Sequence, residues 1–314
     1  MKRCYFTLLL LVQFELYMMS AILAKPLGAP GILSRRDLLS GSYYYKTCPA
    51  AEEIIFRKMK AWFRKDYTLA ASIIRLHFHD CAVRGCDASI LLNYQNSERR
   101  AYASRTLRGF QVIDDIKAKL ERYCPKTVSC ADILTAAARD ATNLLGGPFW
   151  EAPLGRRDGK TSVAKEADLV PQGRENATSL IKFFPGKRIE RSGFGCSLRL
   201  YWRNLTQSCK KSSNFVNLDA TTPKTFDAEY YKNLGKKKGL LSTDQELYSD
   251  PRTAPFVSTF ANQPPDLFYS QFAVSMVKLA NVKVPTPPNE SEIRLNCNYV
   301  NPAPRKNVNP PRHG

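Results

Sequence analysis

Histidine is scarce in this sequence of 314 residues, which contains only His77, His79 and His313. A centre that needs several imidazoles is therefore excluded everywhere except in the short segment that holds the first two. Long apolar runs are also lacking, because the run that begins at Tyr5 is interrupted by Gln13 and Glu15. The sequence is thus not that of a polytopic membrane protein.

Acidic residues are in the minority. The chain has 47 Lys and Arg against 28 Asp and Glu, a net charge of +19, so its surface should attract polyanions. The hydrophobic fraction of 44% and the charged fraction of 24% are ordinary for a globular protein and exclude wholesale disorder. The length suffices for one large domain or two smaller ones, each with its own core.

Residues 1–24 have the features of a secretory signal peptide, with Lys2 and Arg3 ahead of an apolar stretch. We expect this leader to be removed; an uncleaved anchor is the alternative. Cleavage would remove Cys4 and leave eight of the nine cysteines, an even number that suits four disulfides in an oxidising compartment. Three N-glycosylation sequons also fit a secreted glycoprotein, at Asn176, Asn204 and Asn289.

The apolar periodicity is helical and predicts a mostly α-helical domain over residues 25–300. Apolar residues recur at three- and four-residue steps in the ranges 50–67, 70–81, 110–123, 130–145, 227–234, 251–260 and 271–280. Residues 171–209 hold little sustained periodicity, so we expect little regular structure there. Residues 301–314 form a basic, proline-rich tail whose composition indicates disorder.

Arg75 and His79 are the first candidate catalytic residues. They are four residues apart and therefore share one face of the expected helix. A neutral imidazole can take a proton from one peroxide oxygen and return it to the other, and a guanidinium can stabilise the negative charge that develops. Phe78 should lie against the same site, whereas His77 is expected to be structural. The alternative is a buried hydrogen-bonded pair without catalytic function.

A candidate cation site follows directly after His79. Carboxylates, a hydroxyl and backbone carbonyls lie within ten residues, at Asp80, Val83, Gly85, Asp87 and Ser89. Such an oxygen-rich loop suits Ca²⁺ better than Mg²⁺, because nearly all the ligands come from the protein. The spacing of Cys81 and Cys86 favours a local disulfide that would hold the loop. The alternative is a solvated polar turn.

These motifs resemble those of the secretory plant (class III) haem peroxidases. Segment 75–91 resembles the distal-haem helix and calcium loop of that family. Other signatures of the family have counterparts in the same order along the chain, in segments 44–49, 107–110, 128–133, 155–158, 219–231, 239–247 and 293–298.

The resemblance implies an all-α, two-lobed, disulfide-linked monomer that binds haem b in a cleft between a distal half, about 41–170, and a proximal half, about 171–300. It implies reduction of hydrogen peroxide and oxidation of phenolic donors, with His79 as acid–base and Arg75 stabilising O–O cleavage. The implied distal calcium ligands also include Glu98, and the implied proximal ones are Asp219, Thr222, Thr225 and Asp227. Pro171 falls where the family contacts substrate, and Asp132 and Arg156 match a buried ion pair. The implied disulfides are Cys48–Cys124, Cys81–Cys86, Cys130–Cys297 and Cys196–Cys209.

The sequence departs from the family's pattern in its second half. The family's haem iron is held by a histidine in a Ser-Gly-Ala-His-Thr-like motif, but here Ser192-Gly193 is followed by Phe194-Gly195-Cys196. The proximal ligand is therefore absent, the proximal calcium site loses a threonine, and a second shortening precedes Cys209. Asp244 matches the carboxylate that normally accepts the proximal histidine's ring proton. Two further departures are Ser104, where the family usually has an asparagine that hydrogen-bonds the distal histidine, and Ala82, where it usually has an aromatic.

The resemblance and the departures from it lead to two hypotheses for the function. The first is a secreted haem peroxidase of the cell wall, the apoplast or the vacuole. The second is a catalytically impaired, calcium-binding scaffold whose basic surface binds acidic cell-wall polysaccharide. The secretory signal argues against a nucleic-acid partner.

Overall fold

The computed structural model describes residues 39–168, 170–171, 173, 175–186, 219, 221–282 and 289–302, without the side chains of 184–186. The segment Leu39–Gly314 forms one compact unit. Several predictions fall outside the described residues: the signal peptide 1–24, Cys196 and Cys209, the two shortened stretches, and the tail beyond 302.

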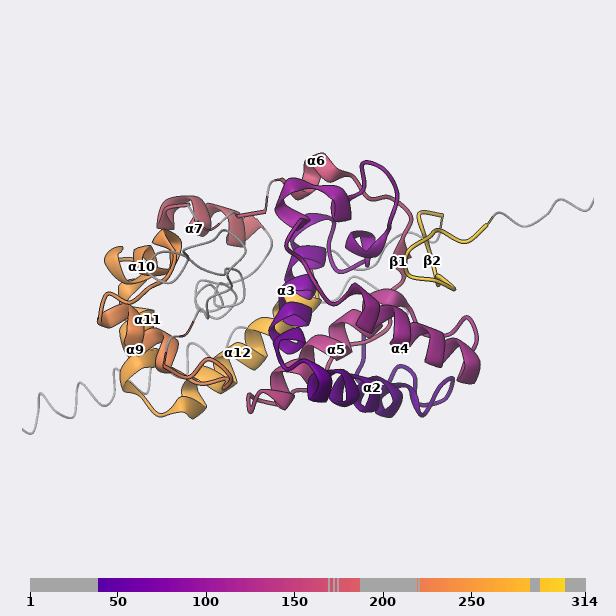
Figure 1. Ribbon diagram of the computed structural model, residues 1–314, viewed down its shortest axis with the longest axis horizontal. Helices are drawn as coiled ribbons and strands as arrows, with labels where there is room; N and C mark the ends of the chain where they lie inside the picture. Colours follow the sequence, from indigo (N-terminus) through magenta and orange to yellow (C-terminus); the bar gives the residue numbers. More distant parts are fainter. Residues whose placement is uncertain are drawn as a thin grey trace, which may run out of the picture. The chain divides into compact units, whose positions relative to one another are not determined.

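Four long helices build the first part of this unit (Figure 1). α3 packs along α5, and α2 packs against α4 and α5. Three short 3₁₀ helices separate α3 from α4. The bounds are α2 Ala51–Lys65, α3 Thr68–Val83, η1 Ser89–Leu91, η2 Glu98–Arg100, η3 Tyr102–Ser104, α4 Phe110–Tyr123 and α5 Cys130–Leu144.

α5 is the central helix of this group. Ser129 caps its N-terminus by accepting a hydrogen bond from the Asp132 N–H at 3.1 Å, and Gly146 lies just beyond its end with a φ of 86°. Every residue from Cys130 to Thr142 is buried. Small alanines between the larger apolar residues allow α2, α3 and α4 to approach it closely, and the predicted ranges for all four helices are confirmed to within a few residues.

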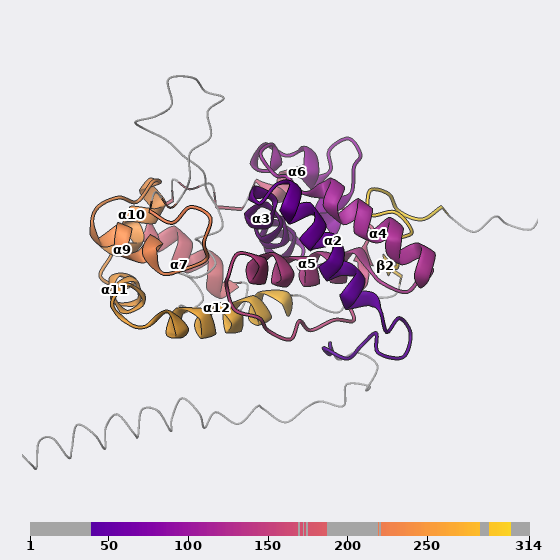
Figure 2. The ribbon, with the colours of Figure 1, turned by 60° about the horizontal axis from the view of Figure 1, so that its bottom comes forward.

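The second part is also helical. α9 and α10 both pack against α11 (Figure 2). α12 contacts α3. An aromatic cluster joins these helices, with ring centroids 5.1 Å apart between Phe226 and Phe268 and between Tyr231 and Phe260. The bounds are α6 Ala164–Ala167, α7 Ala177–Gly186, α9 Glu229–Gly235, α10 Ser242–Ser249, α11 Ala254–Asn262 and α12 Pro265–Ala280.

Three α-helices lie outside the ranges predicted from the sequence, namely α6, α7 and α10. The expectation of little regular structure across 171–209 is wrong for its described part, because α7 begins at Ala177. Asn176 caps this helix by accepting the Ser179 N–H at 3.0 Å, and Leu180 is fully buried. α10 is held at its start by Asp244, which accepts the Leu241 N–H. A capping side chain and a few buried residues therefore suffice for helix where the sequence shows no long periodicity.

Strands are minor among the described residues. β1 (Asp158–Gly159) pairs antiparallel with β2 (Ser291–Glu292), and Ser40 forms an isolated bridge with Leu154. The prediction of a mostly helical fold is confirmed. Within the described part of the chain, no helix combines the length and apolar character needed to cross a membrane.

Three disulfides tie the unit together, and they are pairings that the sequence resemblance implies. They join Cys48 to Cys124, Cys81 to Cys86, and Cys130 to Cys297. The last bond closes a separation of 167 residues, so it fixes the segment after β2 to the start of α5.

Candidate functional site

α3 carries Arg75 and His79 on one face, as their spacing predicts. His79 is fully buried, and the edge of its neighbour Phe78 lies perpendicular to the imidazole with ring centroids 6.1 Å apart. The Arg75 guanidinium donates to the hydroxyl and the carbonyl of Thr106, at 3.0 and 3.3 Å. Thr106 was not among the predicted residues; only its place directly before the 107–110 segment could have suggested it.

The environment of His79 keeps its ring neutral. Burial, and next the positive charge of Arg75, hold the pKa of His79 well below its ordinary value. A neutral imidazole can accept a proton, whereas an imidazolium cannot. The site therefore has the protonation state that general-base chemistry needs at neutral pH.

His77 lies in a different environment from His79. Its Nδ1 is 3.6 Å from the Cys81 sulfur, next to the Cys81–Cys86 disulfide. Burial, and next the charge of Arg156, lower the pKa of His77 to about 3. These surroundings support the structural role expected from the sequence.

The loop after α3 gathers the acidic groups of the candidate distal calcium site. Asp80 accepts the Ala88 N–H at 2.9 Å, and Asp87 accepts the Ser89 N–H at 2.9 Å. The Gly85 carbonyl accepts the Asp87 N–H, and Gly85 has a φ of 99°, which suits glycine in this tight turn. Glu98 is fully buried, and neither of its carboxylate oxygens has a hydrogen-bond partner among the described residues.

This loop concentrates more negative charge than its surroundings neutralise. Burial, and next the charge of Asp87, raise the pKa of Asp80 well above its ordinary value. Burial likewise raises the pKa of Asp87, and it raises that of Glu98 to about 8. The Ser89 hydroxyl is buried without a hydrogen-bond partner within the described residues. Buried carboxylates with unsatisfied oxygens fit a hard divalent cation bound by oxygen ligands, so the loop fits calcium.

The candidate proximal calcium residues are brought together only in part. Asp219 accepts hydrogen bonds from the Thr221 and Thr222 N–H groups, the Thr222 hydroxyl and the Asn233 amide. The Thr225 N–H donates to the Thr222 carbonyl, whereas Asp227 accepts the Glu229 N–H at the start of α9. The loop motif does not indicate Asn233 as a partner of Asp219, because Asn233 lies outside the motif on α9.

Asp244 is buried on α10. Its Oδ1 accepts the Tyr230 hydroxyl at 2.8 Å and its Oδ2 accepts the Leu241 N–H at 3.0 Å. Burial raises the pKa of Asp244 to about 6. Tyr230, on α9, was not predicted as a partner of this carboxylate.

The remaining predicted positions are all buried. Arg156 and Asp132 form a buried ion pair at 2.9 Å, and the Tyr44 hydroxyl donates to Asp132 at 2.7 Å. Pro171 is buried. Ala82 is 5% exposed, and Ser104 is buried in η3 with no hydrogen-bond partner for its hydroxyl within the described part of the chain.

Sequence comparisons find similarity between this chain and known peroxidases. A family model described as peroxidase matches residues 55–192 and 196–263. The chain is 46% identical to Peroxidase 7 of Arabidopsis thaliana, over 84% of this chain and 85% of that protein. It is 38% identical to Peroxidase C2 of Armoracia rusticana, over 85% and 89% of the two chains. It is 36% identical to Peroxidase 1 of Oryza sativa subsp. japonica, over 89% and 98%.

The fold, the distal helix and these similarities define a plant haem peroxidase. The chain belongs to the class III peroxidase family. By this homology it is an oxidoreductase that reduces hydrogen peroxide (EC 1.11.1.7), and its family implies haem, calcium and reduced donor substrates.

Proposed function

We propose that His79 and Arg75 carry out the peroxide chemistry of this chain. The neutral imidazole of His79 accepts a proton from one peroxide oxygen and returns it to the departing oxygen. The Arg75 guanidinium, anchored by Thr106, stabilises the charge that develops as the O–O bond breaks. When bound, haem b supplies the redox chemistry that links peroxide reduction to oxidation of phenolic donors. The observation that carries this proposal is a buried imidazole, kept neutral, on the same helix face as Arg75.

Replacement of His79 tests this assignment. In the haem-loaded chain, with imidazole added to ligate the iron, His79→Leu should lower kcat/KM for peroxide by about 10²–10⁴-fold, the usual contribution of a general acid–base. His77→Leu is the matched control, since it replaces a buried imidazole on the same helix, and it should stay within a few-fold of wild type. A His79→Leu variant as active as wild type would overturn the assignment.

We also propose that this chain supplies no proximal histidine. The distal residues fit the haem, but the sequence has no histidine between residues 80 and 312. Asp244, the carboxylate expected to accept that histidine's ring proton, instead accepts from Tyr230 and Leu241. On this proposal, the proximal helix region is truncated. Turnover is then limited by the missing iron ligand and not by the distal residues.

The oxygen-rich loop is proposed as a calcium site. Asp80, Asp87, Ser89 and Glu98 supply side-chain oxygens, and Val83 and Gly85 supply carbonyls. Asp219, Thr222, Thr225 and Asp227 are proposed as a second site, with Asp219 and Thr222 already in contact. The proposed setting is a secreted monomer without residues 1–24, with Pro171 contacting the donor.

A second candidate function is a calcium-stabilised scaffold that binds acidic wall polysaccharide. It is favoured by the missing histidine and by the net charge of +19. Haem titration separates the two functions. A Soret band at stoichiometric haem supports the peroxidase, whereas its absence, together with salt-sensitive binding to polygalacturonate, supports the scaffold.

A further inference from the structure

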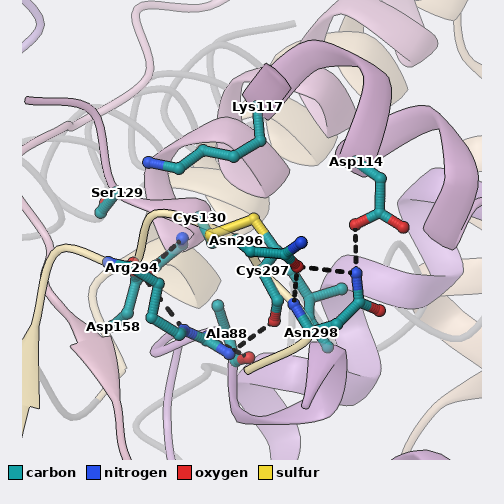
Figure 3. Close-up of a disulfide and its surroundings, with 12 residues drawn as sticks. Ala88, Asp114, Lys117, Ser129, Cys130, Asp158, Arg294, Asn296, Cys297 and Asn298 are labelled. Carbon is teal, nitrogen blue, oxygen red and sulfur yellow. Dashed lines mark hydrogen bonds and ion pairs between the residues drawn. A yellow bond between two sulfur atoms is a disulfide. The ribbon is translucent and has the colours of Figure 1, made fainter. Parts of the chain in front are cut away.

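The C-terminal clasp, which we define as residues 289–302, packs against the first part of the unit. It is fixed at two points: β2 pairs with β1, and Cys297 is bonded to Cys130 at the start of α5. It also touches the calcium loop, because Arg294 reaches the loop from within the clasp (Figure 3).

Arg294 bridges the clasp and the loop with one rigid group. Its side chain is completely buried. One guanidinium nitrogen donates to the Cys297 carbonyl at 2.7 Å, and the other donates to the Ala88 carbonyl at 2.6 Å. The Arg294 backbone N–H donates to Asp158 at 2.9 Å, so the residue is fixed at both ends. The Arg294 side chain therefore connects Cys297, which is bonded to Cys130, with the backbone of the calcium loop.

Ala88 is the point in the loop where this connection matters. It lies between Asp87 and Ser89, two of the proposed calcium ligands, and it has a φ of 60°, a left-handed conformation that alanine rarely adopts. Both polar groups of its backbone are held by charged side chains: Asp80 accepts its N–H, and Arg294 donates to its carbonyl. Such a conformation persists only where the surroundings impose it.

The connection between the clasp and the calcium loop is also electrostatic. Asp80, Asp87 and Glu98 are buried near one another, and the permanent charge of Arg294 acts on Asp87. β1 completes the contact, because the Gly159 N–H donates to the Asp87 carbonyl at 2.7 Å. The loop is thus supported by the clasp and its paired strand, and the proposed cation would be held by the side-chain oxygens of Asp80, Asp87, Ser89 and Glu98.

We infer that Arg294 is a positioning residue for the calcium loop, through which calcium binding and closure of the clasp by Cys130–Cys297 stabilise each other. The inference rests on the proposed calcium site. Because such coupling is reciprocal, calcium must protect the clasp to the same extent that the clasp raises calcium affinity. Lysine cannot replace Arg294, because one ammonium lacks the planar fork that holds two carbonyls at once.

The experiment measures the equilibrium fraction of each disulfide that is reduced in buffers of reduced and oxidised dithiothreitol, with calcium or with EGTA, by alkylation and mass spectrometry. In the wild-type chain, calcium should lower the equilibrium constant for reduction of Cys130–Cys297 by about fivefold or more, the lower end of usual coupling. Cys48–Cys124 is the internal reference, because general loosening of the fold would expose it as well. Its equilibrium constant for reduction should change by less than about twofold, well below that range.

Two variants test the role of Arg294 itself. Arg294→Lys should weaken Tb³⁺ binding, measured by sensitised luminescence, by about fivefold or more and should reduce the selective protection correspondingly. Arg157→Lys is the matched control, because Arg157 donates to Ser291 in the same clasp. It should behave like wild type in both measurements.

The outcomes separate the inference from the proposed function. If the wild-type chain binds neither Ca²⁺ nor Tb³⁺, the calcium site and the inference both fail. If calcium binds but Cys130–Cys297 and Cys48–Cys124 are protected equally, only the inference fails. Wild-type behaviour of Arg294→Lys would overturn the role of Arg294. If Arg294→Lys does not fold, the comparison of Cys130–Cys297 with Cys48–Cys124 in the wild-type chain still tests whether calcium binding and the clasp are coupled.

Discussion

The Ser104 hydroxyl is buried but makes no hydrogen bond to any described residue. The resemblance implies an asparagine at this position, whose amide would reach the distal imidazole. We predict that Ser104→Asn raises kcat/KM for peroxide several-fold, because a hydrogen-bonded imidazole is better oriented and more basic. Ser104→Ala should leave the activity unchanged, since the hydroxyl has no bond to lose. Steady-state kinetics of both variants checks this, and equal activities for asparagine and alanine would contradict it.

A second prediction at this scale concerns the Tyr230–Asp244 hydrogen bond. Tyr230→Phe should lower the free energy of unfolding by about 1–3 kcal/mol, because a buried carboxylate loses its donor. The pKa of Asp244 is raised to about 6, so the group is mostly protonated at pH 5 and mostly ionised at pH 8. The loss should therefore be larger at pH 8 than at pH 5. Urea unfolding at both pH values measures it, and a loss independent of pH would show that the carboxylate is not involved.

At the scale of single elements, the calcium loop supports the clearest prediction. The pKa of Glu98 in the folded protein is raised to about 8, so without metal its ionisation opposes folding. The metal-free fold should be most stable below the ordinary carboxylate pKa and should lose stability as the pH rises toward 8. Bound calcium removes this penalty by stabilising the ionised carboxylates. EGTA should therefore lower Tm by several degrees at pH 8 and by less at pH 5.

Glu98→Gln provides the control for this prediction. The amide cannot ionise, so the pH dependence of the metal-free protein should become shallower. The response of Tm to calcium should shrink as well, because one anionic oxygen ligand is lost. Differential scanning calorimetry at the two pH values measures both effects. A calcium response that grows toward pH 5 would contradict the assignment.

The elements differ in how far the sequence predicts them. α4 begins and ends at the predicted residues, because its apolar residues at helical spacing are fully buried, namely Val112, Ile113, Ile116 and Leu120. α12 is predicted to begin at residue 271 but starts at Pro265, since proline is favoured in the first helical turn. α7 escapes prediction because a single capping side chain and a few buried residues define it.

The candidate site likewise contains residues whose roles the sequence predicts and residues whose roles it does not predict. The pairing of Arg75 with His79 follows from one helix period, and the calcium loop follows from a run of local oxygen ligands. Thr106, Tyr230 and Arg294 could not be predicted in their roles, because each reaches its partner from an element that only the tertiary fold brings near. Local spacing carries no information about such contacts.

At the scale of the whole chain, disulfides and strand pairing join segments that are far apart in the sequence. Cys48–Cys124 and Cys130–Cys297 close separations of 76 and 167 residues, and the clasp pairs with β1 across a similar distance in sequence. These bonds tie the calcium loop and α3 to segments far away in the sequence. On the proposed function, the distal residues therefore keep their positions although the proximal histidine is missing.

The most direct test of this account is peroxide-dependent oxidation of guaiacol by the haem-loaded, calcium-saturated chain, with and without added imidazole. If the distal residues are competent and only the proximal ligand is missing, activity should be low and should rise by about tenfold or more when imidazole ligates the iron. His79→Leu should not respond, because the distal acid–base is then missing as well. Full activity of the wild-type chain without imidazole would contradict the account, and so would an equal response of His79→Leu.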